Sequence, residues 1–164
     1  ARLVFFHLVR PAYWCRPNTR NGIIQRIIWA EPRQIIGDSH LELLFASFLE
    51  KCTDVISYAK NYLAVHFTID YVNADGNISH YYPDFIVKTR DKDLFIVETK
   101  GLEDPDVPLK MARLKNWCED INATQKNVRF EYVFVDEEDF NTYKPDSFSS
   151  LVNNFRKYKD DKTG

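Results

Sequence analysis

The chain has 164 residues and a net charge of −2, and 45% of its residues are hydrophobic. This length suffices for one domain with a core of its own, and the composition is that of a soluble globular protein. No apolar run reaches membrane-spanning length and no signal peptide is visible, so neither a membrane protein nor a secreted protein is expected. Three widely spaced cysteines, Cys15, Cys52 and Cys118, predict reduced thiols in a cytoplasmic protein rather than a disulfide framework or a zinc site.

Charge is distributed unevenly along the chain. The first 36 residues contain six arginines and a single acid, Glu31, whereas the remainder carries a charge of −7. A basic segment of this kind either lies along a polyanion such as DNA or contacts a neighbouring domain, and the sequence favours neither. Because the chain starts at Ala1 and its only methionine is Met111, we expect a piece of a longer polypeptide. Residues 1–36 are therefore predicted to be an extension or linker from a preceding domain.

The first elements lead into a helix that is well marked in the sequence. Residues 2–9 indicate a strand, and residues 22–30 indicate a strand or a short helix. Ser39 and Glu42 form a capping-box pattern, in which Ser39 is the N-cap and the Glu42 carboxylate reaches back to it. Apolar residues at helical spacing then predict a core-facing helix to about Cys52. After it we expect a short helix or turn over 53–61, a strand over 63–72 and a turn over 73–77.

Residues 81–101 predict a central hairpin, because two apolar runs rich in β-branched and aromatic residues flank a short polar turn. A turn centred in this segment pairs Phe85 with Val97, and it sets Asp84 opposite Glu98. Directly opposed residues have Cβ atoms roughly 4.5–5.5 Å apart, so the two carboxylates are expected to face one another.

This hairpin breaks local rules in a way that indicates a functional site. Pro83 cannot donate a hydrogen bond to a sheet, and opposed carboxylates repel each other and lose solvation when half buried. A divalent cation offsets the cost to the carboxylates, and hard oxygen ligands suit Mg²⁺. The period of two along a strand places Lys100 on the same face as Glu98. We therefore interpret Asp84, Glu98 and Lys100 as a metal-dependent hydrolytic centre.

The remaining elements alternate between helix and strand. Asp106 is expected at the start of a helix that runs to about Asn122, on which Lys110, Arg113 and Trp117 share one flank. This flank could contact a phosphate backbone and a base, but a solvated face beside a partly buried tryptophan is the plainer interpretation. The domain is completed by a strand over 128–135, a short helix with acids in its first turn from 136, and a helix capped by Ser147.

The Pro-Asp pair at 83–84, followed by Glu-Thr-Lys at 98–100, resembles the motif of the PD-(D/E)XK nuclease superfamily. The resemblance implies that Asp84 and Glu98 hold Mg²⁺, for which Mn²⁺ can substitute, and that the carbonyl of Thr99 contributes a further ligand. Lys100 would orient the attacking water or help to deprotonate it. Glu42 matches a carboxylate that such nucleases often carry on the first helix near the metal, although the capping box explains it without any metal.

A closer resemblance covers about residues 38–155. The similar family is the C-terminal endonuclease region of type III restriction enzyme Res subunits, and the segments that carry the likeness are 42–49, 60–61, 82–87 and 96–101. It implies an α/β fold with the αβββαβ core of the superfamily, a mixed sheet flanked by helices, and an endonuclease domain over residues 37–164.

The same resemblance implies partners. Double-stranded DNA would be the substrate, with Lys60, Lys110 and Arg113 as residues that contact it. The parent chain would carry a helicase or translocase domain, and a separate methyltransferase subunit would read the DNA sequence. No Gly-rich phosphate-binding loop is present, so no ATP site is expected in this segment.

The predicted function is Mg²⁺-dependent hydrolysis of DNA phosphodiester bonds. One alternative is a nucleic-acid-binding or assembly module that retains the nuclease fold without cutting. A second alternative is an interdomain scaffold in which the two acids merely cap a strand. The complete set of Asp84, Glu98 and Lys100 argues against a relic, because a protein that no longer cuts need not retain all three.

Overall fold

A computed structural model of the chain describes residues 39–61, 67–91, 93–101 and 105–159. The extension 1–36 and the strands predicted over 2–9 and 22–30 lie outside the described residues, as does much of the first half of the strand predicted over 63–72. Within the described part, no helix is long and apolar enough to cross a membrane.

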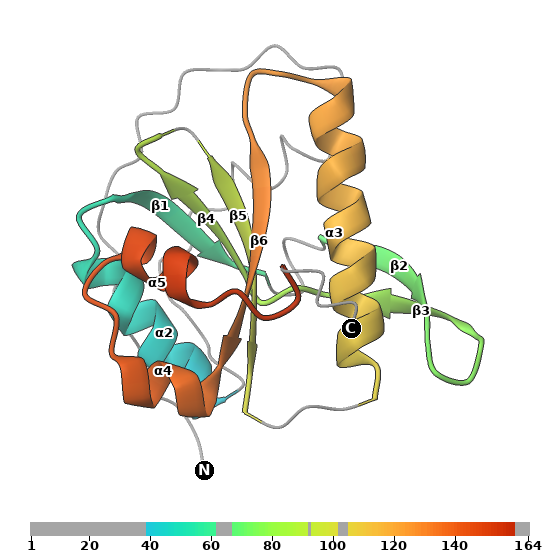
Figure 1. The fold of residues 1–164 in the computed structure, drawn as a ribbon, viewed down its shortest axis with the longest axis horizontal. Helices are drawn as coiled ribbons and strands as arrows, with labels where there is room; N and C mark the ends of the chain where they lie inside the picture. The colour runs from blue at the N-terminus through green and yellow to red at the C-terminus, as the bar shows by residue number, and fades with distance from the viewer. Residues whose placement is uncertain (1–38, 62–66, 92, 102–104, 160–164) are drawn as a thin grey trace.

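The central sheet has four strands in the order β1-β4-β5-β6. They are β1 (Val55–Lys60), β4 (Phe85–Thr89), β5 (Leu94–Lys100) and β6 (Phe130–Asp136). β4 pairs antiparallel with both β1 and β5, whereas β5 and β6 are parallel. A parallel pair needs a long crossover, and α3 (Val107–Thr124) supplies it. The protein is therefore a mixed α/β domain with a mixed sheet flanked by helices (Figure 1).

Each face of the sheet is covered by its own hydrophobic core. One core lies against α2 (His40–Lys51), α4 (Glu137–Tyr143) and α5 (Phe148–Asn154), with Phe45 of α2 and Val97 of β5 fully buried in it. The other core lies against α3 and contains Ile96, the neighbour of Val97. Because successive residues of a strand point to opposite faces, β5 supplies both cores and its polar end residues divide between the two faces.

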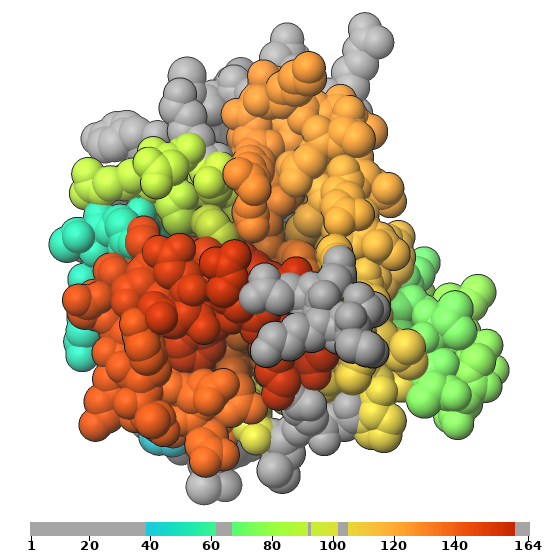
Figure 2. Space-filling model, in the orientation of Figure 1, coloured from blue at the N-terminus to red at the C-terminus, as the bar shows by residue number. Residues whose placement is uncertain are grey.

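A separate two-stranded sheet packs beside α3. Its strands β2 (Ile69–Val72) and β3 (Ile78–Tyr81) are antiparallel, with Ile69 opposite Tyr81. The turn between them contains Gly76 at a positive φ of 81°, as the Asp-Gly signal predicts. Figure 2 shows this hairpin projecting from the body of the domain beside α3.

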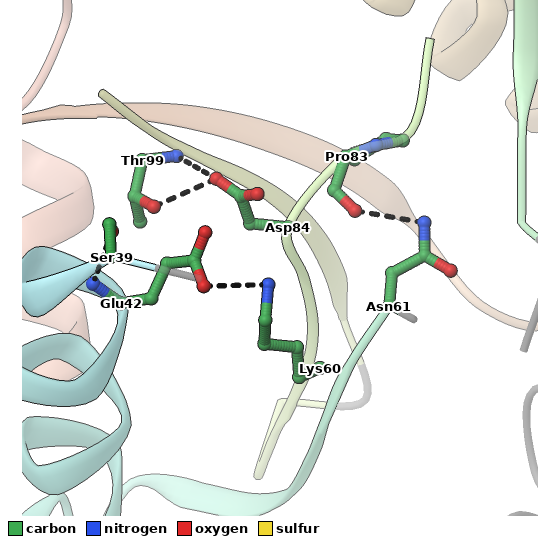
Figure 3. A network of polar contacts seen from close by, with 7 residues as sticks. All are labelled: Ser39, Glu42, Lys60, Asn61, Pro83, Asp84 and Thr99. Atoms are coloured by element: carbon green, nitrogen blue, oxygen red, sulfur yellow. Dashed lines mark hydrogen bonds and ion pairs between the residues drawn. The ribbon is translucent and has the colours of Figure 1, made fainter. Parts of the chain in front are cut away.

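The predicted capping box at the start of α2 is half present. Ser39 is the N-cap, and its side chain accepts a hydrogen bond from the backbone N–H of Glu42 at 3.2 Å. The carboxylate of Glu42 points instead towards Lys60 (Figure 3). α2 ends at Lys51, where Cys52 turns to an extended conformation, one residue from the predicted end.

The prediction of a short helix or turn over residues 53–61 is wrong, because this segment contains β1. Val55 is buried and Ile56 is exposed, but the burial of the residues that follow shows no clear period of two. The segment therefore lacks the alternation that distinguishes a strand from a helix or turn in a sequence. Pairing decides the conformation: β1 lies along β4, with Lys60 opposite Phe85 and a register shift between Val55 and Ser57. Strand pairing over a distance of some 30 residues is invisible to local patterns.

The first arm of the predicted hairpin, residues 81–87, is broken, because Tyr81 ends β3 and β4 begins only at Phe85. The break lies at Tyr82–Asp84, where Pro83 has no N–H to donate to a ladder. The three strands that follow the first helix in the main sheet are therefore β1, β4 and β5, with β2 and β3 inserted after β1. With the inserted hairpin set aside, the element order is α-β-β-β-α-β, followed by the two short helices α4 and α5.

The later elements agree with the predictions. α3 extends two residues beyond Asn122, and β6 spans Phe130–Asp136. The side chain of Asp136 caps α4 by accepting hydrogen bonds from two backbone N–H groups of its first turn. Ser147 caps α5. These helix starts were readable because caps act over three residues, a range within which the sequence alone suffices.

A buried amide, that of Asn61, ties the inserted hairpin to the main sheet. Its Nδ2 donates to the carbonyls of Phe67 at 2.7 Å and Pro83 at 2.8 Å, and its Oδ1 accepts from the N–H of Phe67 at 3.2 Å. The backbone N–H of Asn61 donates to the carbonyl of Asp84 at 2.7 Å. One side chain therefore satisfies three buried backbone groups at the chain crossing that precedes β4.

We predict that Asn61→Ala lowers the free energy of unfolding by about 2–4 kcal/mol, because it leaves three backbone groups in a buried site without this partner. Urea denaturation followed by circular dichroism measures the change. Asn154→Ala is the matched control, because Asn154 donates from an exposed position to Ser150 and should cost less than about 0.5 kcal/mol. Equal losses in the two variants would contradict the role assigned to Asn61.

Candidate functional site

The candidate site lies where β4 begins and β5 ends. The predicted register is confirmed, since Phe85 pairs with Val97, and Asp84 and Glu98 are the next residues beyond that end of the ladder. The backbone of Asp84 is fixed on both sides: its N–H donates to the carbonyl of Val97 at 3.0 Å, and its carbonyl accepts from Asn61.

Thr99 holds the carboxylate of Asp84. Oδ2 of Asp84 accepts hydrogen bonds from the backbone N–H of Thr99 at 2.8 Å and from its hydroxyl at 2.7 Å (Figure 3). Burial raises the pKa of Asp84, against the lowering effects of Thr99 and of the Lys60 ammonium; the charge of Glu42 adds to the rise. The sequence predicted Thr99 as a ligand through its carbonyl, but it missed this use of the side chain and N–H.

Tyr81 holds the carboxylate of Glu98. Glu98 is only 6% exposed, and its Oε2 accepts a hydrogen bond from the Tyr81 hydroxyl at 3.0 Å. Burial raises the pKa of Glu98 to about 8, and the charge of Asp84 adds to the rise. The hydrogen bond from Tyr81 and the charges of Lys100 and Lys110 oppose it. The two carboxylates are thus electrostatic neighbours, as their predicted positions across the hairpin require.

Each of these carboxylates keeps one oxygen without a hydrogen bond. Among the residues that the structure describes, neither Oδ1 of Asp84 nor Oε1 of Glu98 receives a donor, while the other oxygen of each is held. Enclosed carboxylate oxygens without donors are costly in a protein interior. A cation at this position would remove the cost.

A buried ion pair stands beside Asp84. Nζ of Lys60, on the last residue of β1, lies 2.8 Å from Oε2 of Glu42 on α2, and both side chains are almost fully buried. The ammonium also lies 5.5 Å from the centre of the Phe85 ring. Lys60 therefore lies inside the site, where its charge reaches Asp84. A direct contact of Lys60 with DNA stays a prediction, as does a role of Glu42 as a metal ligand.

The other predicted site residues lie on the opposite side of the pair. Lys100 ends β5, and its charge and that of Lys110 both reach Glu98. Nζ of Lys110 lies 5.8 Å from the centre of the Tyr71 ring. Nε of Arg113 donates to the backbone carbonyl of Asp70 at 3.1 Å, at an exposed position on β2. The structure thus brings Lys100 and Lys110 to Glu98, whereas Arg113 lies against the hairpin.

Trp117, on the same helix, belongs to the core. Its ring contacts those of Phe67 and Phe130 at centroid distances of 5.2 and 5.5 Å, both edge-on. This placement agrees with the plainer interpretation of the flank, a partly buried tryptophan beside solvated side chains.

Two residues to which the sequence assigned no role complete the site, Asn61 and Tyr81. Asn61 looked like the end of a helical turn, and Tyr81 like one aromatic residue among several in a strand. The available signal for Tyr81 was the alternation in β3, where His80 is exposed, Tyr81 is buried and Tyr82 is exposed again. Alternation predicts which way Tyr81 faces but cannot name the carboxylate that it meets.

The carboxylate oxygens of the site are ligands that suit a hard cation. Within the described ranges, no three His, Cys, Asp or Glu side chains are grouped so as to hold a metal, so Glu42, Asp84 and Glu98 do not form a preassembled three-acid site. Within the described residues Asp84 and Glu98 still have one carboxylate oxygen each without a donor, and such oxygens are the ligand type that Mg²⁺ prefers. The chemistry of these two acids therefore suits Mg²⁺, whereas Glu42 is paired with Lys60.

Comparisons with protein-family models, with curated proteins and with solved structures each found no match.

We predict that Glu98 makes the metal-free protein less stable as the pH rises. Its folded-state pKa of about 8 lies above the ordinary value of 4.5, so the folded protein keeps a proton that the unfolded chain releases. The contribution of Glu98 to the free energy of unfolding is fully present below pH 4.5 and is lost as the pH rises through 8. The slope is at most about 1.4 kcal/mol per pH unit.

The measurement is the difference in unfolding free energy between wild type and Glu98→Gln across this pH range, in buffer with a chelator. The difference should fall with pH, and Glu119→Gln, at an exposed position on α3, should run parallel to wild type. Parallel curves for Glu98→Gln as well would show that Glu98 titrates normally.

We also predict that Lys60→Met costs about 3–5 kcal/mol of stability, because it leaves the buried Glu42 carboxylate without the ammonium that faces it. The double variant Glu42→Gln/Lys60→Met should recover much of this loss. Arg129→Met is the control, since the ion pair of Arg129 with Glu131 is largely exposed and is worth about 1 kcal/mol or less. Chemical denaturation of wild type, Lys60→Met, Glu42→Gln and the double variant measures the cycle, and additive losses would contradict a coupled pair.

Proposed function

We propose that this chain is a Mg²⁺-dependent endodeoxyribonuclease domain of the PD-(D/E)XK type, which hydrolyses phosphodiester bonds in double-stranded DNA. The observation that carries the proposal is the pair Asp84 and Glu98, which lie on adjacent strands of the sheet; each has one oxygen held and one that receives no donor from the described part of the chain. Lys100 lies two residues beyond Glu98, and its charge reaches that carboxylate.

The topology supports the same proposal. Without the inserted hairpin the order of elements is α-β-β-β-α-β followed by two short helices. Asp84 immediately precedes the second strand of that order, β4, and Glu98 lies on the third, β5. The resemblance of the sequence to the nuclease superfamily implies this order and this placement of the acids.

Each residue of the site has its own role in the proposed reaction. Asp84, Glu98 and the carbonyl of Thr99 would hold Mg²⁺. The ion would lower the pKa of a bound water and offset the charge that develops on the phosphate. Lys100 would orient the attacking water, and Lys60 helps to keep Asp84 ionised, since its charge lowers the pKa of that carboxyl. Glu98 must give up its proton before it can act as a ligand.

The wider setting is part of the proposal. Lys110 and Arg113 lie on the flank of α3 beside the site, where they could contact DNA phosphates. The similarity of the sequence to the endonuclease region of type III restriction enzyme Res subunits suggests a helicase or translocase domain in the same parent chain. It also suggests a methyltransferase subunit that selects the DNA sequence, so the domain alone would have little to position it on a substrate.

We predict that the wild-type protein nicks supercoiled plasmid when Mg²⁺ or Mn²⁺ is present and that Glu98→Gln lowers the rate at least a hundredfold, because the variant loses a charged metal ligand. Agarose gel analysis over time measures the rate. Glu119→Gln, a matched change at an exposed position on α3, should nick like wild type. DNA binding without any metal-dependent cleavage, even with the translocase present, would favour a non-cleaving binding module.

A second test does not need activity. Millimolar Mg²⁺ should raise the melting temperature of wild type, since a ligand of the native state stabilises it. Asp84→Asn should lose most of this rise and keep a native circular dichroism spectrum, because the change removes a charge that raises the pKa of Glu98. Loss of secondary structure in Asp84→Asn, or no effect of Mg²⁺ on wild type, would contradict the metal site.

A further inference from the structure

Tyr81 connects the inserted hairpin to the carboxylate of Glu98. It is the last residue of β3 and is only 2% exposed, and its hydroxyl donates to Oε2 of Glu98 at 3.0 Å. Its ring belongs to the core that α3 covers, and its backbone pairs with Ile69 of β2. The position of the hydroxyl is therefore set by the packing of the hairpin on α3.

The phenol is a fixed donor. Its ring is packed in the core and its hydroxyl donates to Oε2 of Glu98 at 3.0 Å; burial raises the pKa of Tyr81 well above its ordinary value. A buried carboxylate oxygen accepts strongly from such a donor. This contact fixes one oxygen of Glu98 and determines where the second oxygen, Oε1, can lie.

The two acids of the site are thus held in the same manner from different parts of the fold. Thr99 holds Oδ2 of Asp84 and leaves Oδ1 without a donor, and Tyr81 holds Oε2 of Glu98 and leaves Oε1 without a donor among the described residues. Partners that orient metal-binding carboxylates in this way commonly change metal affinity when they are removed.

We propose that Tyr81 is a positioning residue that orients the Glu98 carboxylate so that Oε1 faces the cation, which makes the β2–β3 hairpin a structural part of the metal site. The inference rests on the proposed function, because it assumes that Asp84 and Glu98 bind Mg²⁺. Tyr81 itself touches neither substrate nor water-accessible surface, since it is almost fully buried. It acts through Glu98.

The test is the affinity of the full 164-residue chain for Mn²⁺ without DNA. Free Mn²⁺ is followed by electron paramagnetic resonance in wild type, Tyr81→Phe, Tyr132→Phe and Glu98→Gln. Tyr81→Phe removes one oxygen atom and keeps the ring in the core. Tyr132→Phe is the matched control, because the hydroxyl of that buried tyrosine donates a hydrogen bond to the carbonyl of Tyr158 and not to either acid.

The expected result is a Mn²⁺ dissociation constant that rises about tenfold to a hundredfold in Tyr81→Phe and stays unchanged in Tyr132→Phe, with both proteins folded by circular dichroism. Wild-type affinity in Tyr81→Phe would overturn the role of Tyr81 and leave the metal site standing. If wild type and Glu98→Gln are alike in failing to bind Mn²⁺, the proposed function fails and this inference fails with it.

A second variant keeps the proposal testable if Tyr81→Phe is not recovered folded. Glu98→Asp keeps the charge but withdraws the carboxylate from the Tyr81 hydroxyl by one methylene, so Mn²⁺ affinity should fall by a similar factor. In a folded double variant, Tyr81→Phe should add no further loss to Glu98→Asp. Unchanged affinity in Glu98→Asp, or a full additional loss in the double variant, would overturn the proposed orientation.

Discussion

Two acids, one just before β4 and one near the end of β5, are the constraint on which the site depends. Burial raises the pKa of Asp84 and of Glu98, and the charge of Asp84 adds to the rise at Glu98. Such a pair persists only where the surrounding structure supplies donors and positive charge. Hydrogen bonds from Thr99 and Tyr81 supply the donors, and the nearby lysines supply the positive charge. These residues come from distant parts of the chain.

The sheet receives this support from both of its faces. On one face α2 and β1 bring the Glu42–Lys60 ion pair, whose ammonium acts on Asp84. On the other, the inserted hairpin brings Tyr81 and α3 brings Lys110, both of which act on Glu98. The break at Pro83 also contributes to the site, because it lets the chain cross from the hairpin into the main sheet immediately before Asp84.

Within the described residues these contacts leave one oxygen of each acid unsatisfied, and the proposed metal binding depends on this. Thr99 and Tyr81 each satisfy one oxygen, while the second oxygen of each acid has no donor among the described residues. A folded protein that keeps such atoms does so at a cost in stability, and costs of this kind concentrate at functional sites. A divalent cation would change the balance, because the same oxygens would become its ligands.

The sequence by itself determined what short-range chemistry controls: the caps at Ser39, Asp136 and Ser147, the Asp-Gly turn, and the register that puts Asp84 across from Glu98. Only the tertiary structure decided that 55–60 is a strand, that the arm divides at Pro83, and that Asn61 and Tyr81 belong to the site. The physical reason is range. Caps and turns involve neighbours within a few residues. The strand that pairs with β1, the Pro83 carbonyl that Asn61 binds and the Glu98 carboxylate that Tyr81 binds lie some 17 to 34 residues away, and only packing brings them into contact.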